Sequence, residues 1–333
     1  MMAGVFPGPT CPTPVQQYGG FGTAAELWVK NDGLSHPVYG GNKVRKAVRL
    51  IEEAQRRNAQ RVLTFGAVGS HHVLTMALFA RAAGLQAAAV LIPQPRSEHV
   101  VRTVRASLGA GLEPYAASRS ALAPLAFLRA RRRGDYVVPP GGSNLLGTAA
   151  YADAVDELVL QIEQGALPAP DWIVSALGSG GTCAGILAGV IRRRLSCRVM
   201  AVQVLPGFVP RAAVRWLARR VLETTGHADR LAEVEDRVTF DADHVGRGYG
   251  FATEAGEHAT QVASAHGLVL EQTYTAKAFA KALELLADSA PRPLGRPLRV
   301  LYWHTFTATR LDDLLAAAPS AELLPKPILR LLR

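Results

Sequence analysis

One lysine stands where the local sequence favours covalent chemistry. Gly40 and Gly41 allow a tight turn of the backbone, and Asn42 and Lys43 follow at the start of a predicted helix. The positive end of the helix dipole disfavours an ammonium group there, so it favours the neutral amine that forms a Schiff base with a carbonyl. A solvated lysine in the first turn of a helix is the alternative, and Lys43 alone does not decide between the two.

A glycine-rich turn, Ala176 to Thr182, lies between a predicted strand and a predicted helix and is suited to binding a phosphate. Backbone N–H groups at a helix start have no partner within the helix, and glycines let an anion approach them closely. The turn is not a P-loop, which needs Gly-Lys-Ser/Thr, and it lacks the spacing of the dinucleotide motif. A plain strand-to-helix connection is the alternative, but the density of glycine, serine and threonine favours phosphate.

A second turn of this kind, Gly66 to Gly69, leads into Ser70, His71 and His72. A serine at this place most often caps the helix that follows. Its hydroxyl could instead act in catalysis or hold a substrate carboxylate at the positive end of the helix. Taken alone, the two histidines are typical of a core or of a solvated surface.

Six motifs in a fixed order give the chain a resemblance to a known family. They are Gly40-Gly41-Asn42-Lys43-Val44-Arg45-Lys46, Gly69-Ser70-His71, Pro140-Gly141-Gly142-Ser143-Asn144 with Gly147, the turn Gly178 to Thr182, Gly248-Tyr249-Gly250, and Tyr274-Thr275-Ala276-Lys277-Ala278. The chain resembles the family of 1-aminocyclopropane-1-carboxylate (ACC) deaminase and D-cysteine desulfhydrase. These are pyridoxal-phosphate (PLP) enzymes of fold type II, the tryptophan-synthase-beta-like group. The resemblance covers about Glu26 to Thr305 and implies an α/β enzyme with two domains, parallel sheets and bound PLP.

The resemblance also implies roles for single residues. Lys43 would hold PLP as a Schiff base, and Ser70 would act near the substrate carboxylate, as a nucleophile or as a proton relay. Tyr249 and Tyr274 would complete the catalytic set by polarising or deprotonating the substrate. The cofactor-binding residues would be Lys43, Asn42, His71, Gly178, Ser179, Gly180, Gly181, Thr182, Thr275 and Thr305.

Three positions depart from the pattern of the family. His71 stands where members usually carry an asparagine that bonds the ring hydroxyl of PLP. Thr275 stands where ACC deaminases carry a glutamate that pairs with the pyridine nitrogen, and Phe306 follows Thr305 where members have glycine. A hydroxyl partner makes the ring a weaker electron sink than a carboxylate does, and β-elimination of a good leaving group needs less of a sink. Thr275 and His71 therefore favour a lyase over a ring-opening deaminase, whereas His71 and Phe306 motivate the alternative of a non-catalytic homologue, against which the intact Lys43 and phosphate turn argue.

The expected reaction acts on a small amino acid. The substrate amine displaces Lys43 from PLP, and the freed amine removes the α-proton. β-Elimination then gives a 2-oxo acid, ammonia and a leaving group, which is sulfide when the substrate is D-cysteine. A deaminase of the ACC type and a non-catalytic homologue that binds a ligand remain alternatives, and the substrate and its chirality stay open.

Predicted strands alternate with predicted helices, which indicates parallel sheets with helices on both faces. Strands are expected at residues 26–30, 61–65, 87–93, 112–115, 136–139, 172–176, 198–204 and 299–303. Helices are expected at residues 43–57, 70–83, 98–107, 121–133, 144–164, 181–194, 210–235, 253–266 and 276–287. We expect a large PLP-binding domain from residues 1–46 and 156–333, and a smaller inserted α/β domain from residues 47–155.

The composition is that of a globular protein, with 333 residues, of which 49% are hydrophobic and 19% are charged. We find no apolar run of membrane-spanning length and no secretory signal. The three cysteines, Cys11, Cys183 and Cys197, fit a reducing cytoplasm and have no metal-type spacing, so no metal site is expected.

The net charge of +10 could attract nucleic acid, but Arg131 to Arg133 and Arg192 to Arg194 stand at predicted helix ends without interleaved aromatic residues. We expect a small amino acid as substrate, neither nucleic acid nor membrane as partner, and, from the resemblance, a homodimer.

Overall fold

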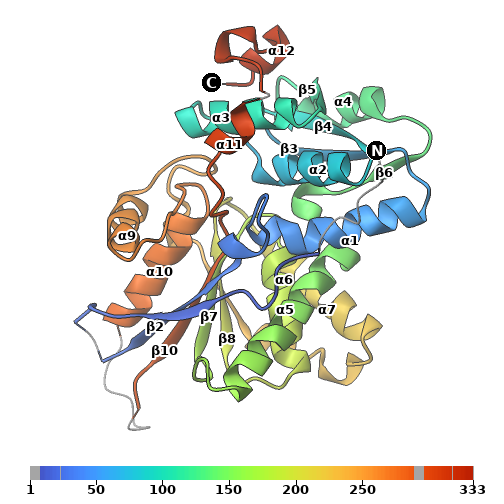
Figure 1. Ribbon diagram of the computed structural model, residues 1–333. Helices are drawn as coiled ribbons and strands as arrows, with labels where there is room; N and C mark the ends of the chain where they lie inside the picture. Colours follow the sequence, from blue (N-terminus) through green and yellow to red (C-terminus); the bar gives the residue numbers. More distant parts are fainter. Residues whose placement is uncertain (1–7, 23, 289–295, 317, 333) are drawn as a thin grey trace. The chain divides into compact units, whose positions relative to one another are not determined.

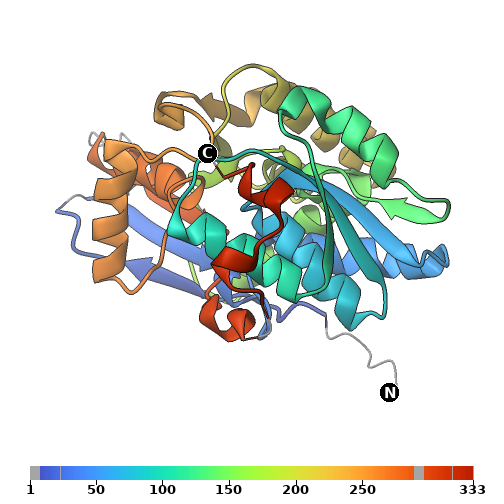
Figure 2. The same ribbon diagram turned by 90° about the horizontal axis from the view of Figure 1, so that it is seen from above.

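The computed structural model describes residues 8–22, 24–288, 296–316 and 318–332, which form two compact units (Figures 1 and 2). Among these described residues, unit 1 contains those up to residue 9, residues 43–147 and those from 309 onward, and unit 2 contains those from 10 to 42 and from 148 to 308. The chain passes from unit 2 into unit 1 between Asn42 and Lys43. The predicted division of the chain at residues 46 and 155 stays a prediction about folding domains.

Unit 2 is built on a six-stranded sheet. Its strands are β1 (Val15–Tyr18), β2 (Glu26–Asn31), β7 (Trp172–Leu177), β8 (Arg198–Gln203), β9 (Val238–Asp241) and β10 (Arg299–His304). Its helices are η1 (Asp32–Leu34), α5 (Leu145–Glu163), which begins in unit 1, α6 (Gly181–Arg192), α7 (Val209–Thr224), η4 (Ala228–Arg230), α8 (Glu233–Asp236), η5 (Asp243–Val245), α9 (Glu254–Ala265) and α10 (Thr275–Ala287). The order of the strands is β1-β2-β10-β7-β8-β9, and only the β1–β2 pair is antiparallel.

Helices cover both faces of this sheet, as a parallel sheet with nearly continuous buried strands requires. Helix α10 packs on β7 and β10, whereas α6 packs on β7 and β8 (Figure 1). The apolar core between the sheet and α10 includes Val174, Phe279 and Tyr302. Since α6 begins directly after β7, its first turn lies at the carboxyl end of a central strand, where ligands bind in open α/β sheets.

Unit 1 is built on a four-stranded parallel sheet in the order β5-β4-β3-β6. Its strands are β3 (Arg61–Ala67), β4 (Gln86–Ile92), β5 (Leu112–Ala116) and β6 (Asp135–Val137). Its helices are α1 (Asn42–Arg56), whose first residue belongs to unit 2, α2 (His71–Ala82), α3 (Glu98–Gly109), η2 (Ser120–Leu122), α4 (Ala123–Ala130), η3 (Pro140–Gly142), α11 (Asp312–Leu315), η6 (Ala321–Leu323) and α12 (Lys326–Leu329). Helices α2 and α3 pack against each other, and α2 also packs on β3 and β4.

The C-terminal segment, which we expected in the larger domain, packs within unit 1. The Arg105 guanidinium donates to the backbone carbonyl of Pro319 at 2.7 Å, and the backbone N–H of Gln94 donates to that of Leu331 at 3.2 Å. Arg102 on α3 also pairs with Asp312 on α11.

All eight predicted strands are found, most within two residues of their expected ends. The single helix expected at residues 210–235 is wrong, because α7 ends at Thr224 and Gly226 takes a left-handed conformation with φ of 80°. The helix expected at 121–133 is a 3₁₀ turn followed by α4, which ends at Ala130. The edge strands β1 and β9 were not predicted.

Candidate active site

The segment that leads to Lys43 packs backbone against backbone, which explains its two glycines. A Cβ on Gly40 would stand 1.8 Å from the carbonyl oxygen of Gly33. A Cβ on Gly41, whose φ is +96°, would stand 2.9 Å from the carbonyl oxygen of Thr305. The same Thr305 oxygen accepts a hydrogen bond from the backbone N–H of Asn42 at 3.1 Å. Thr305 therefore fixes the backbone next to Lys43 through its carbonyl group.

A buried carboxylate residue, Asp32, holds this segment in place, and the sequence patterns did not predict this role. The carbonyl oxygen of Asp32 accepts a hydrogen bond from the Gly41 N–H at 2.7 Å. Its carboxylate accepts from the hydroxyls of Thr13 and Tyr151 and, at 2.8 Å, from the indole N–H of Trp303. Since Asp32 has no exposed surface, these bonds must replace the water that its charge would otherwise bind.

The glycine-rich turn joins β7 to α6 as predicted. Gly180 is the N-cap of α6 with φ of 96°, and no side chain caps the helix. The first-turn N–H groups of this 12-residue helix therefore point out of its positive end, where an anion can bind them. The side-chain amide of Asn42 donates to the hydroxyl of Thr182 at 3.0 Å. The residue directly before Lys43 is thus bonded to the turn predicted to bind phosphate.

Tyr249 and Tyr274 lie together in unit 2. The Tyr274 hydroxyl donates to the Tyr249 hydroxyl at 3.0 Å, and the two rings meet edge to face. The Tyr274 ring also covers the glycine-rich turn, since a Cβ on Gly178 would stand 2.8 Å from its Cε1 atom. Burial raises the pKa of Tyr249 to about 12 and that of Tyr274 well above its usual value. Both phenols are therefore neutral at physiological pH, a state suited to donating hydrogen bonds and not to removing a proton.

Two charged side chains hold the segments that carry these tyrosines. The fully buried ammonium of Lys277 donates to the carbonyl oxygens of Val245 at 2.7 Å and Gly248 at 3.1 Å, just before Tyr249. The Glu271 carboxylate accepts from three successive backbone N–H groups, those of residues 273, 274 and 275, at the start of α10. The sequence patterns point to neither residue for such a role.

The hydroxyl of Thr275 is engaged with the backbone of α10. It accepts a hydrogen bond from the Glu271 N–H at 2.8 Å and lies 3.2 Å from the Glu271 carbonyl oxygen, to which it donates. Thr275 is buried. The predicted bond between this hydroxyl and the pyridine nitrogen stays a prediction, and it would have to redirect the hydroxyl hydrogen away from Glu271.

Ser70, His71 and Lys43 lie in unit 1. Ser70 is the N-cap of α2, and its hydroxyl accepts from the Val73 N–H at 3.4 Å. His71 is the first residue of α2, and its Nε2 lies 2.7 Å from Nε2 of His99, which the sequence patterns missed. Burial, reinforced by the charges of His99 and Lys43, holds the pKa of His71 well below its usual range.

The neighbouring His72 points towards the sheet and has a different hydrogen-bond partner from His71. Its Nε2 lies 2.8 Å from the hydroxyl of Thr64 on β3, which in turn donates to the Val138 carbonyl oxygen. Of the two adjacent histidines, His72 is therefore a core residue.

The sequence pattern of a family described as "Pyridoxal-phosphate dependent enzyme" matches residues 8–302 of the chain. The chain belongs to this family. Its resemblance to PLP enzymes and the predicted α/β fold are thereby confirmed.

Nocardicin C-9′ epimerase of Nocardia uniformis subsp. tsuyamanensis is 31% identical to the chain over 328 residues, which cover 93% of this chain and 94% of that protein. D-cysteine desulfhydrase of Serratia proteamaculans is 30% identical over 297 residues, covering 86% and 88% of the two proteins. A crystal structure of an ACC deaminase homologue superposes with a TM-score of 0.76 and 29% identity, covering 92% of this chain and 93% of the other.

The side chains of this PLP-dependent enzyme fit its cofactor. A phosphate monoester carries close to two negative charges at neutral pH, and the start of α6 offers backbone N–H groups beside residues that are small or lack a side chain. A covalently held aldehyde needs a lysine, and Lys43 follows directly after the Asn42 that bonds to Thr182. The chain thus has residues of the kinds that would hold each end of the cofactor.

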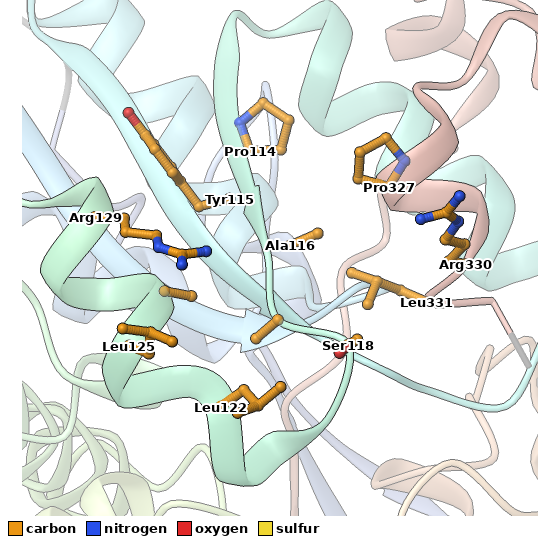
Figure 3. Close-up of a pocket in the computed structure, with 12 residues that line it drawn as sticks. Pro114, Tyr115, Ala116, Ser118, Leu122, Leu125, Arg129, Pro327, Arg330 and Leu331 are labelled. Atoms are coloured by element: carbon orange, nitrogen blue, oxygen red, sulfur yellow. The ribbon is translucent and has the colours of Figure 1, made fainter.

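A separate cavity lies wholly within unit 1 and contains none of the predicted site residues. Its volume is about 440 Å³, and Figure 3 shows Leu122, Leu125 and Arg129 on one side of it and Pro327, Arg330 and Leu331 on the other. Both arginines are exposed. We therefore do not assign the chemistry of the amino-acid substrate to this cavity.

Within the described residues, no three histidine, cysteine or acidic side chains are grouped so that they could hold a metal ion. No helix among these residues combines the length and the apolar character needed to cross a membrane.

Proposed function

We propose that this PLP-dependent enzyme removes the α-proton of a small amino acid with the Lys43 amine and eliminates a substituent from the β-carbon. The products would be a 2-oxo acid, ammonia and a leaving group, which is sulfide for D-cysteine. The hydrogen bond of 3.0 Å from Asn42 to Thr182 is the observation that carries the proposal. It bonds the residue that precedes Lys43 in the sequence to the turn suited to phosphate, and in the proposal Lys43 and this turn hold the two ends of PLP.

In this proposal, the residues of the chain divide the work. The phosphate of PLP would be held by Gly178, Ser179, Gly180, Gly181 and Thr182, with Asn42, His71, Thr275 and Thr305 as further cofactor contacts. PLP supplies the electron sink that makes the α-proton acidic. Ser70, at the positive end of α2, would hold the substrate carboxylate. Tyr274 and Tyr249, neutral and hydrogen-bonded, would donate a proton or hydrogen bond to the departing group.

The names of relatives suggest two other reactions at the α-carbon as alternatives. An ACC deaminase opens a ring, and an epimerase returns the proton without releasing a group. D-Cysteine desulfhydration is placed before ring opening because Thr275 stands where ACC deaminases carry a glutamate and His71 stands where members of the family usually carry an asparagine.

A panel of substrates separates these outcomes. Purified protein is given D- and L-cysteine, D- and L-serine and ACC, and 2-oxo acid, ammonia, sulfide and the optical purity of the remaining substrate are measured. Release of sulfide, ammonia and a three-carbon 2-oxo acid in equal amounts supports the proposal. Turnover of ACC alone, or loss of optical purity alone, would replace it by the corresponding activity. Binding of PLP without turnover on any substrate would support a ligand-binding homologue.

The cellular setting belongs to the same proposal. We expect a cytoplasmic homodimer that uses neither nucleic acid nor a membrane as partner. The three cysteines, at positions 11, 183 and 197, are few and odd in number, which fits a reducing compartment. Exposed apolar side chains at Phe208, Val209 and Trp216 of unit 2 offer area that a second copy could cover. Light scattering at micromolar concentration would give the oligomeric state.

A further inference from the structure

Two histidine rings meet in unit 1, where α2 and α3 begin. His71 is the first residue of α2 and His99 is the second residue of α3. Their Nε2 atoms are 2.7 Å apart, and the ring centroids are 4.9 Å apart with 30° between the ring planes, so the rings meet edge to edge at these nitrogens. Both rings are only partly accessible to solvent. A separation of 2.7 Å between two nitrogens is a hydrogen-bond distance, so one nitrogen carries a hydrogen and the other accepts it.

This geometry limits the number of protons that the pair can hold. In the neutral pair, one ring is protonated at Nε2 and the other at Nδ1, since only one hydrogen fits between the two Nε2 atoms. Adding one proton leaves that hydrogen bond intact. Adding a second would place two N–H groups head to head at 2.7 Å, so the rings would have to separate. While the contact lasts, the two rings therefore titrate as one unit and not as two independent histidines.

The surroundings favour the neutral form of the pair. Burial, first of all, and the positive charge of Lys43 on α1 hold the pKa of His71 below its usual range, and a proton on His99 of α3 would act in the same direction. The next residue, His72, is also kept neutral by burial and by the charges of Lys43 and Lys46. The strands under α2 contribute the neutral Thr64 hydroxyl to His72. Burial and these lysines act in the same direction, against a proton on the pair.

We propose that His99 is a positioning residue that holds His71 as a neutral ring in one tautomer, so that His71 presents one fixed hydrogen-bonding group beside Lys43. That His71 faces the cofactor rests on the proposed function. Burial keeps His71 neutral, but a lone neutral histidine exchanges its two tautomers, whereas a histidine bonded to His99 can change its tautomer only together with that of His99. Such a ring resembles a neutral amide, which also presents a fixed hydrogen-bonding group. The substitution His71→Asn supplies such an amide directly.

The proton between the rings can be observed without any enzymatic assay. In protein labelled uniformly with ¹⁵N, a scalar coupling between the two Nε2 nuclei would report the N–H···N bond. We expect this coupling in the wild type and its loss in His99→Leu. We also expect the resonances of both rings in the wild type to respond with the same midpoint to the first protonation step of the pair. A first step that one ring shows and the other does not, or the absence of the coupling, would overturn the proposal.

A double-mutant cycle tests whether His99 acts through His71. The affinity of the apoprotein for PLP is measured by absorbance for the wild type, His99→Leu, His99→Gln, His71→Asn and the double variant His71→Asn/His99→Leu. Loss of one neutral hydrogen bond weakens binding by about three- to tenfold, so we expect this loss in His99→Leu, with a steeper decline at acid pH. His99→Gln, whose amide can still bond to Nε2 of His71, should retain most of the affinity.

The effect of His99→Leu in the His71→Asn background decides whether His99 acts through His71. In the His71→Asn background, His99→Leu should change the affinity less than twofold. An equal loss in both backgrounds would show that His99 acts independently of His71 and would refute the inference. If the wild type does not bind PLP at all, the proposed function fails, while the nitrogen coupling still decides whether the histidine pair exists.

Discussion

The substitution Gly178→Ala should weaken PLP binding through one defined contact. The added Cβ would stand 2.8 Å from Cε1 of the Tyr274 ring, closer than side-chain carbons approach in folded proteins. The ring must move, and it can do so only by disturbing its hydrogen bond of 3.0 Å to Tyr249 or the turn itself. Overpacking of this kind costs about 1–3 kcal/mol. If this cost falls on the bound state, affinity for PLP drops by about five- to 150-fold.

The assay is a titration of apoprotein with PLP, followed by absorbance, alongside urea unfolding of the apoprotein. Gly19→Ala is a matched control, since a Cβ there meets nothing within 4 Å and the glycine has no positive φ. In the background of Tyr274→Leu, which removes the ring, Gly178→Ala should cause little further loss. An unchanged affinity for Gly178→Ala, or the same loss in the Tyr274→Leu background, would refute the steric argument.

Three further substitutions test the framework of the site. Burial lowers the pKa of His304 from its usual value of 6.5 to about 4, so its contribution to stability is complete above pH 6.5 and is lost as the pH falls towards 4. The free energy of unfolding lost in this way is about 3 kcal/mol at most. Urea unfolding should therefore show a fall in the free energy of unfolding between pH 7 and 4 that is smaller by this amount in His304→Gln than in the wild type. The same fall in both proteins would contradict the lowered pKa of His304. Lys277→Met should remove the ammonium donor from the Val245 and Gly248 carbonyls, which then accept only the longer backbone N–H bonds of 3.2 and 3.4 Å. The substitution should lower the free energy of unfolding by about 1–3 kcal/mol and reduce kcat; a variant with unchanged kcat would show that this loop does not matter for turnover. Asp32→Asn should lower the free energy of unfolding by a similar amount, because the new amide N–H₂ must face one of the N–H or O–H donors that now bond the carboxylate. Thermal unfolding measures this loss, and an unchanged Tm would argue against a charged Asp32.

Local chemistry made a large part of this structure predictable. Ser70 was expected to cap a helix, and it does, because cap residues are selected by bonds within four residues of the chain. The turn from Gly178 to Thr182 was recognised for a similar reason, since glycine and a following helix are sufficient to describe it. The alternation of buried strands and helices gave the fold class because each pattern is read within one element.

Features that depend on distant parts of the chain escaped prediction. The carboxylate of Asp32 bonds to Tyr151 and Trp303, which are 119 and 271 residues away, so nothing near Asp32 shows that it is buried. His99 meets His71 only because α2 and α3 pack side by side, and no sequence spacing links the two. Strand β1 was missed because two of its four residues are exposed glutamines, as an edge strand allows.

Covalent trapping at Lys43 tests the central claim most directly. Purified protein with bound PLP is reduced with borohydride, digested and analysed by mass spectrometry. We predict that the mass of the reduced cofactor is found on the peptide containing Lys43 and that it is absent from this peptide in Lys43→Ala. The modification of a different lysine in the wild type, or the absence of any trapped cofactor from protein saturated with PLP, would contradict this account.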